Sequence, residues 1–498
     1  MPLDHNARIA HDTGNTEVRE LLACLQGNIL KGHGRDHTVH IFVKFSQKNV
    51  KTLRKNLIAF ANDYVVSALQ QQIEREQFKK YKIPGALFGN LFLTANGYRA
   101  LGFTSEQLAN AFAEEDLAFG TQSNFLEGMQ AHGDELNDPT VNEWEEGYQG
   151  DAIDAMILLA DDDRDYLHRQ ARTVINRIDD FCKILVVERG DALRDPITKE
   201  GIEHFGYVDG RSQPIYFKDD LDGESAITAW NPVEPLKFVL VRDKNVPDAE
   251  CYGSYFVFRK LEQNVLAFRA HEIELADFLG FTTDEERARA GAMAVGRFRD
   301  GTPVVLQQTD GLVPPKENNF NFRNNNDPNN PKSDPNGLKC PFQAHIRKCN
   351  PRGDITGNPD DEGAERSRRI TRRGITYDDR KSRLTDGECL QDLPTRNVGL
   401  LFMCFQASIR NQFAFMQRFW VNDEDFVKPG TGIDPIIGQA GASSIPQKWR
   451  PQWGDSETGN NGGTETKEFS FHGFVRLKGG EFFFAPSIPF LKTFAPPK

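Results

Sequence analysis

The alternation of apolar and polar positions predicts a compact set of strands and helices in the first part of the chain. Val39, Ile41, Val43 and Phe45 alternate with other residues, which is the period of a half-buried strand. Thr104 and Gln107 form the pattern of a capping box before a short helix. The expected elements are a strand at 39–45, a helix at 53–65, a strand at 86–94, a short helix at 108–113, a strand at 155–160, a helix at 163–178 and a strand at 184–187. Without the short helix, this order of strands and longer helices is typical of a ferredoxin-like α+β unit.

A second set of elements follows after residue 225 and is interrupted by insertions. The expected elements are a strand at 255–258, helices at 272–279 and 283–295, a strand at 398–407 and a closing hairpin at 469–484. The predicted architecture is therefore α+β, with two ferredoxin-like domains that each contain an antiparallel sheet and packed helices. The expected boundaries are a flexible N-terminus at 1–20, an N-terminal domain at 21–225 and a C-terminal domain at 226–498.

Three segments break the apolar pattern. Residues 317–337 are rich in Asn and Pro, residues 354–369 are charged, and residues 454–466 are rich in Gly, Asn and Thr. Their polarity predicts surface loops. The first two either shape the entrance to a pocket or are tolerated insertions, and the pattern alone favours neither.

Composition narrows the classes of function. The 498 residues suffice for two domains, and 72 acidic against 60 basic residues exclude a broad nucleic-acid footprint. No apolar run reaches the length of a membrane span, and the N-terminus lacks the features of a secretory leader, so we expect a cytoplasmic protein with no membrane partner. Secretion is the alternative if a leader was removed. The 7 Cys are scattered, which predicts reduced and mostly buried thiols.

Asp209 is the first candidate for chemistry. It stands between Gly206 and Gly210 in the string FGYVDGRSQP, where glycine permits backbone angles that other residues avoid. A carboxylate on such a turn can face a small cavity. An ordinary turn has the same appearance, since Asp beside Gly is a common turn pair.

His345 is the second candidate. It lies in the string CPFQAHIRKCNPR, and a neutral imidazole is a frequent ligand of haem iron. Cys340 and Cys349 flank it, but no fourth ligand with zinc-site spacing is close in the sequence. A histidine with a purely structural role remains the alternative on composition alone.

A basic cluster forms the third candidate. Its arginines are 366, 368, 369, 372 and 373, in an otherwise acidic protein. Such a cluster suits a solvated patch or a site for an anion.

Together these strings resemble the signatures of the dye-decolourising peroxidases, in the larger, insertion-rich branch of the family. The GxxDG pattern around Asp209 is similar to the distal motif, the His345 string to the proximal segment, and RRGITY at 372–377 to the distal arginine motif. Further similarity lies at 26–37 (QGNILKGHGRDH), 296–304 (GRFRDGTPV) and 479–487 (GGEFFFAPS), so the resemblance covers nearly the whole chain.

The resemblance implies a haem peroxidase that reduces hydrogen peroxide and oxidises organic donors such as dyes and phenolics. It implies one haem b per chain, held mainly by the C-terminal half, with Asp209 and Arg372 as the distal acid–base residue and cation and His345 as the proximal ligand. Arg347 is expected to meet a haem propionate, and Asp434 to accept a hydrogen bond from His345. Leu400, Phe402 and Gly210 are expected to bind the cofactor, with Leu400 and Phe402 as the roof of the distal cavity. Tyr377 is the expected electron relay, and the weaker candidates are Trp144, Trp230, Trp420, Trp449 and Trp453. The oligomeric state is left open.

Two other classes remain open at this point. A haem carrier or sensor on the same scaffold would bind haem without turnover. A hydrolase with two carboxylates, one of them Asp209, would need no cofactor.

Overall fold

The structure is a computed structural model, and its described residues cover most of the chain. These residues are 9, 14–46, 48–112, 123–196, 198–221, 231–246, 250–312, 317–323, 333–358, 361, 363–378, 389–441, 444–454 and 466–496. The expected domain boundary at 225/226, Trp230 and most of the Gly-rich segment at 454–466 lie outside them.

The N-terminal half contains a four-stranded antiparallel sheet. Its strands are β1 (His37–Phe45), β2 (Phe88–Leu93), β3 (Ala155–Asp161) and β4 (Cys182–Asp191), in the spatial order β4-β1-β3-β2. The helices α2 (Val50–Tyr64) and α9 (Arg164–Ile178) connect β1 to β2 and β3 to β4. This order is ferredoxin-like, and it confirms the expected fold class for the first half.

The C-terminal half repeats the order with longer insertions. Its strands are β6 (Tyr252–Gln263), β7 (Thr371–Arg372), β8 (Ile375–Asp378), β9 (Val398–Gln406) and β12 (Val475–Ala485), with the short β5 (Val241–Arg242) paired to β6. The spatial order is β12-β6-β9-β7, and β8 also pairs with β9. Helices α10 (Val265–Leu279) and α11 (Asp284–Val295) follow β6, as the first crossover of a ferredoxin-like unit does.

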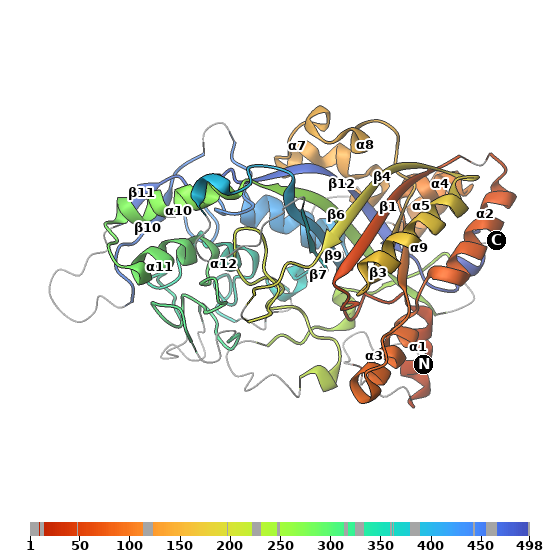
Figure 1. Cartoon of the computed structure of the whole chain (residues 1–498), viewed down its shortest axis with the longest axis horizontal. Coiled ribbons are helices and arrows are strands. Elements are labelled where there is room, and N and C mark those ends of the chain that lie inside the picture. The colour runs from red at the N-terminus through yellow and green to blue at the C-terminus, as the bar shows by residue number, and fades with distance from the viewer. Residues whose placement is uncertain are drawn as a thin grey trace.

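The two halves form one continuous sheet. Strands β2 and β12 meet where Leu93 pairs with Phe484. At the other end, Thr376 of β8 donates its hydroxyl to the Asp191 carbonyl of β4 and accepts from the Leu193 N–H, which brings the two outer edges together. In Figure 1 the strands of both halves lie side by side in the middle, between α2, α5 and α9 at one end and α10 and α11 at the other.

The remaining α-helices and strands of the described residues lie outside these two sets. They are α1 (Thr16–Cys24), α3 (Ala68–Tyr81), α4 (Ala95–Ala100), α5 (Ser105–Phe112), α6 (Asn124–Glu127), α7 (Gly133–Leu136), α8 (Glu146–Gln149), α12 (His345–Cys349), β10 (Gln447–Trp449) and β11 (Lys467–Phe469). The capping box before α5 is confirmed, because Thr104 and Gln107 each donate their backbone N–H to the other's side chain. None of the helices in the described part of the chain combines the length and apolar character needed to cross a bilayer.

One local expectation is wrong. The hairpin expected at 469–484 does not form, because β11 pairs with β10 while β12 pairs with the distant β6. The alternating pattern identified the strands, but it carries no information about the partner. The segment at 1–20 that was expected to be flexible includes the start of α1, whose first turn is capped by the Asn15 side chain, and the buried Ile9.

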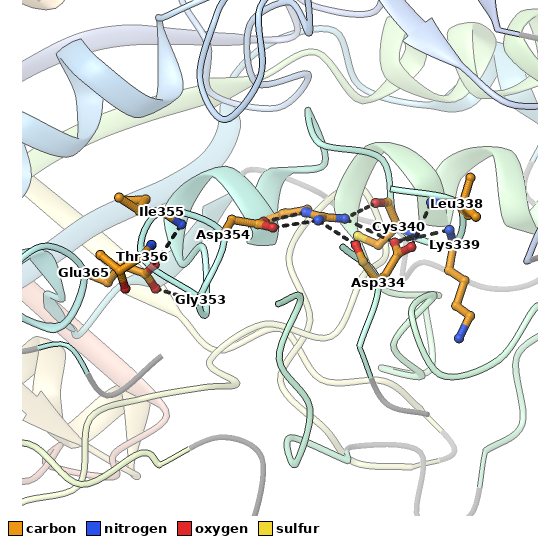
Figure 2. Close-up of polar contacts among 10 residues, drawn as sticks. Asp334, Leu338, Lys339, Cys340, Gly353, Asp354, Ile355, Thr356 and Glu365 are labelled. Carbon is orange, nitrogen blue, oxygen red and sulfur yellow. Dashed lines mark hydrogen bonds and ion pairs between the residues drawn. The ribbon is translucent and has the colours of Figure 1, made fainter. Parts of the chain in front are cut away.

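The polar insertions are also less exposed than expected. Asn321 and Glu365 are buried although both lie in segments predicted to be surface loops. The Glu365 carboxylate accepts the backbone N–H groups of Gly353, Ile355 and Thr356, as Figure 2 shows. A polar side chain can be buried in such a loop because it supplies the hydrogen bonds that the loop backbone lacks.

Candidate active site

The Asp209 turn is held by the partly buried carboxylate of Glu203. Glu203 accepts the N–H groups of Phe205 and Tyr207, while the Asp209 N–H donates to Gly201 O. Gly206 and Gly210 take positive φ angles of 95° and 74°, which explains why glycines stand at these positions. The turn leaves the Asp209 side chain partly exposed at a cavity wall.

Arg372 lies opposite Asp209 across this turn. Its Nη1 is 3.1 Å from Asp209 Oδ1, and its Nη2 donates to the Arg211 carbonyl at 2.6 Å. Arg372 is in β7, which pairs with β9, and its own N–H donates to the Gln213 side chain. The sheet and the turn together therefore fix the carboxylate and the cation, which are 163 residues apart in the sequence.

His345 begins α12 and faces the same cavity. Its Nδ1 is 2.8 Å from Asp434 Oδ2, and Asp434 is fully buried with Oδ1 accepting the N–H groups of Ile436 and Ile437. Burial lowers the pKa of His345, but Cys349 and Asp434 outweigh this effect and hold the pKa well above its usual value. With Nδ1 engaged by Asp434, the other ring nitrogen is the one that could bind a metal.

Cys349 stands one helical turn after His345 and was not predicted to belong to the site. Its Sγ is 3.7 Å from His345 Nδ1 and 3.9 Å from Asp434 Oδ2. One donor atom from each of these three residues lies within 4.8 Å of the others, as in a metal-binding group. Cys340, the other flanking cysteine, is buried and does not belong to this group. The two cysteines that flank His345 in the sequence therefore do not form one metal site with it.

One cavity joins these residues. Asp209, Arg372 and His345 all line it, and Leu400 and Phe402 contribute from β9. Leu400 and Phe402 face the same side of the strand, as residues two apart must. Much of the remaining wall is apolar and includes Leu261, Val295, Ile370, Phe413, Met416 and Val421.

A second cavity adjoins the first. Asp209, Arg372, Leu400 and Phe402 line both, and Gly210 lines only the second. Lys31, Gly32, Tyr216, Asp220 and Arg373 complete much of its wall. The Asp209 carboxylate and the Arg372 guanidinium therefore lie between the two cavities.

The expected propionate role of Arg347 is wrong. Arg347 is fully buried, and all of its N–H groups are used: they donate to the carboxylates of Asp334 and Asp354 and to the carbonyls of Asp334 and Cys340. Figure 2 shows Asp334 and Asp354 pointing toward each other within this network. The guanidinium also lies 4.4 Å and 4.3 Å from the ring centroids of Phe322 and Phe342. Arg347 thus ties the insertions to α12 and does not line the cavity.

Other arginines line the cavity instead, and two of them, Arg297 and Arg352, are buried beside the Asp209 turn's Ser212. Arg297 donates to the Gly301 and Glu317 carbonyls and to the Asn318 side chain, and Arg352 donates to Ser212 Oγ at 2.8 Å. Burial and then repulsion from Arg211 lower the pKa of Arg297 to about 10, and burial and then repulsion from Arg297 lower that of Arg352. Both residues lie in sequence segments that carried the resemblance, but nothing in those segments distinguished them from Arg347.

The aromatic relay candidates are mostly buried. Tyr377 lies in β8 at 8% exposure, with Lys260 Nζ 5.0 Å from its ring centroid, and it lines neither cavity. Trp144, Trp420 and Trp449 are buried too. Trp453 is partly buried and donates to the Val304 carbonyl.

Comparison with known proteins places this geometry in a family. The model of the DyP dimeric alpha+beta barrel domain matches residues 25–192. A relative named multifunctional dye peroxidase DyP2, from Amycolatopsis sp., is 38% identical over 99% of this chain and 100% of its own length. The solved structure of a DyP-type peroxidase from Anabaena sp. is 38% identical, covers 99% of this chain and 98% of its own, and superposes with a TM-score of 0.84. A dye-decolorizing peroxidase solved in complex with 2,6-dimethoxyphenol is 27% identical, covers 95% and 98% of the two chains, and has a TM-score of 0.72.

Identity of this extent over almost the whole chain settles the assignment, and these three relatives are all named as peroxidases. The chain belongs to the family of dye-decolorizing, DyP-type peroxidases.

Proposed function

We propose that this peroxidase binds one haem b per chain in the cavity between Asp209 and His345, and uses hydrogen peroxide to oxidise dyes and phenolic donors. The observation that carries the proposal is the Asp209–Arg372 pair, 3.1 Å apart, at a cavity that also exposes a histidine bonded to a buried carboxylate. The relatives support dyes as donors by their names, and the complex with 2,6-dimethoxyphenol supports phenolics.

The residues present fit a haem group. Arg297 and Arg352 place two buried cations at the cavity wall, and burial together with repulsion from neighbouring arginines lowers the pKa of each. Haem propionates are carboxylates that would offset this excess positive charge with charge-assisted hydrogen bonds. The apolar walls would hold the porphyrin, and His345 would supply the axial nitrogen.

Bound haem would supply the iron and the electrons for cleavage of the peroxide O–O bond. Asp209 takes a proton from one oxygen of hydrogen peroxide and delivers it to the other, which leaves as water. Arg372 keeps the carboxylate in place and offsets the negative charge that develops as the O–O bond lengthens. Leu400 and Phe402 limit the space beside Asp209 to small molecules.

Asp434 determines the tautomer, orientation and basicity of the His345 ring. By accepting the Nδ1 hydrogen bond it fixes the tautomer and the ring orientation, and it increases the basicity of the other nitrogen. The two backbone N–H groups on Oδ1 hold Asp434 itself in one orientation. The same carboxylate therefore positions the ligand and tunes it.

Bulky donors must give up their electrons outside the cavity. Tyr377 is the proposed relay because its ring is nearly buried beside Lys260, so a radical on it would be shielded from solvent. This role is separable from peroxide cleavage, since Tyr377 lines neither cavity.

The decisive experiment compares Asp209→Asn with the parent enzyme after haem reconstitution. The variant should bind haem with the parent's absorption spectrum, while its spectral response to one equivalent of hydrogen peroxide should slow by about 10²–10⁴-fold, the usual contribution of a positioned acid–base group. Asp310→Asn, at an exposed position away from both cavities, is the matched control. A parent-like rate in Asp209→Asn would remove Asp209 from the mechanism.

A further inference from the structure

Two cysteines that are far apart in the sequence lie side by side at the junction of the two halves. Cys24 is the last residue of α1, and Cys251 immediately precedes β6. Their sulfur atoms are 3.3 Å apart although 227 positions separate them, and both are free thiols. A disulfide needs a sulfur separation of about 2.05 Å, so closure requires a shift of only ~1.3 Å.

The backbone on both sides of the pair is fixed. The Cys24 carbonyl accepts the Ile488 N–H, and the Cys251 carbonyl accepts the Asp243 N–H, both at 2.8 Å. Just beyond Cys24, the buried Gln26 side chain donates to the carbonyls of Leu91 and Pro486, next to the seam between β2 and β12. The proximity of the thiols therefore comes from rigid elements of both halves.

The two thiols are chemically unequal. Cys251 is buried and donates its S–H to Cys24, whereas Cys24 is partly exposed. This hydrogen bond, aided by Lys492, lowers the pKa of Cys24 to about 7 against the opposing effect of burial, while the pKa of Cys251 is raised. The thiolate is the reactive form of cysteine, so Cys24 is the nucleophile and Cys251 the resolving thiol.

We propose that Cys24 and Cys251 form a peroxide-sensitive dithiol that closes to a disulfide and fastens α1 to the start of β6. The Cys24 thiolate attacks one oxygen of hydrogen peroxide, the O–O bond breaks, and a sulfenic acid and hydroxide form. The Cys251 sulfur then attacks the Cys24 sulfur, the S–O bond breaks, and the Cys251 proton leaves with the oxygen as water. Two thiols are oxidised by two electrons, one peroxide is reduced, and two waters result. The oxidant is the same peroxide that the enzyme consumes, but the step does not involve the haem site.

The test uses the reduced, full-length holoenzyme, exposed to increasing equivalents of hydrogen peroxide. The reaction is stopped with catalase and a thiol-alkylating reagent, the remaining thiols are counted after denaturation, and linked peptides are identified by mass spectrometry. We expect two of the 7 thiols to disappear and a linked Cys24–Cys251 peptide to be found in a monomeric product. Dithiothreitol should restore both thiols. The thermal unfolding midpoint should rise on oxidation, because a cross-link between residues 227 positions apart restricts the unfolded chain.

Variants separate the steps. Cys251→Ser should accumulate a sulfenic acid at Cys24 that dimedone traps, and Cys24→Ser should give neither the sulfenic acid nor the cross-link. Cys389→Ser is the matched control, since Cys389 is exposed and away from the pair, and this variant should behave as the parent does. Oxidation of Cys389 while Cys24 and Cys251 remain thiols would overturn the proposal, and so would a Cys24 sulfenic acid that never yields the cross-link in the parent. The thiol count does not depend on haem turnover, so these outcomes are distinct from a failure of the peroxidase mechanism.

Discussion

Replacement of Arg347 by Met tests whether this buried arginine holds the fold together or holds the cofactor. Met roughly preserves the apolar stem between Phe322 and Phe342 and removes every guanidinium hydrogen bond. The carboxylates of Asp334 and Asp354 would then remain buried without their cation.

The expected loss of folding stability is large. Removal of one partner from a buried ion pair costs about 3–5 kcal/mol, and the upper end applies here because two carboxylates lose a partner. For 498 residues at about 2.1 cal/mol/K each, the entropy of unfolding is about 1 kcal/mol/K, so the melting temperature should fall by about 5 °C. Arg418→Met is the control, because Arg418 and Glu135 form a partly exposed pair that contributes at most about 1 kcal/mol.

The pH dependence gives a second readout. Burial raises the pKa of Asp334 and Asp354, and Arg347 opposes that rise. Without Arg347 both carboxyls should bind protons more readily in the folded than in the unfolded chain. Stability of the variant should then increase as the pH falls from 7 toward the unfolded pKa of about 4, so that its deficit relative to the parent shrinks.

Urea unfolding followed by tryptophan fluorescence, at pH 7 and at pH 5, measures both effects. Haem titration of the folded variant at low temperature completes the test. We expect haem affinity close to that of the parent for Arg347→Met and a loss of tenfold or more for Arg297→Met, since Arg297 lines the cavity and Arg347 does not. A destabilisation no larger than that of Arg418→Met, or loss of haem affinity without loss of stability, would refute the structural role of Arg347.

Three further predictions concern other sites. Burial raises the pKa of Glu481 to about 7. Protonation of Glu481 therefore stabilises the folded chain fully below the pKa of an unfolded Glu, and this stabilisation is lost as the pH rises through 7. The free energy of unfolding should change by roughly 3 kcal/mol over that range. Glu481→Gln should therefore flatten the pH dependence of urea stability, and an unchanged slope between pH 5 and 8 would contradict this. Asp434→Asn should weaken the His345–iron bond by about 10–100-fold, seen as faster haem transfer to apomyoglobin, with exposed Asp310→Asn as the control. Thr283→Ala should destabilise α11 by about 1 kcal/mol, because Thr283 and Glu286 form a complete capping box, and a loss below a few tenths would show that the helix does not need the cap.

The amino-acid sequence predicted what depends on neighbouring residues. The alternation at Val39 to Phe45 and the Thr104–Gln107 box determine a strand and a helix start, because side-chain direction and capping are local properties of the backbone. The glycines around Asp209 likewise mark a turn that the structure contains. The strings around Asp209, His345 and Arg372 also pointed to the family, which the relatives confirm.

Only the tertiary structure decided what depends on long-range packing. Periodicity does not choose between β6 and β11 as the partner of β12, and polarity does not exclude Glu365 from the interior when it satisfies the backbone around it. The sequence does not distinguish Arg347 from Arg352. In the structure, Arg347 donates its hydrogen bonds to buried carboxylates, whereas Arg352 lines the cavity. The Cys24–Cys251 pair has no sequence signature at all. In each case the outcome depends on which surfaces the folded sheet brings together. Hydrogen bonding and burial depend on how close two groups are in space, and the separation of the groups along the chain does not determine that.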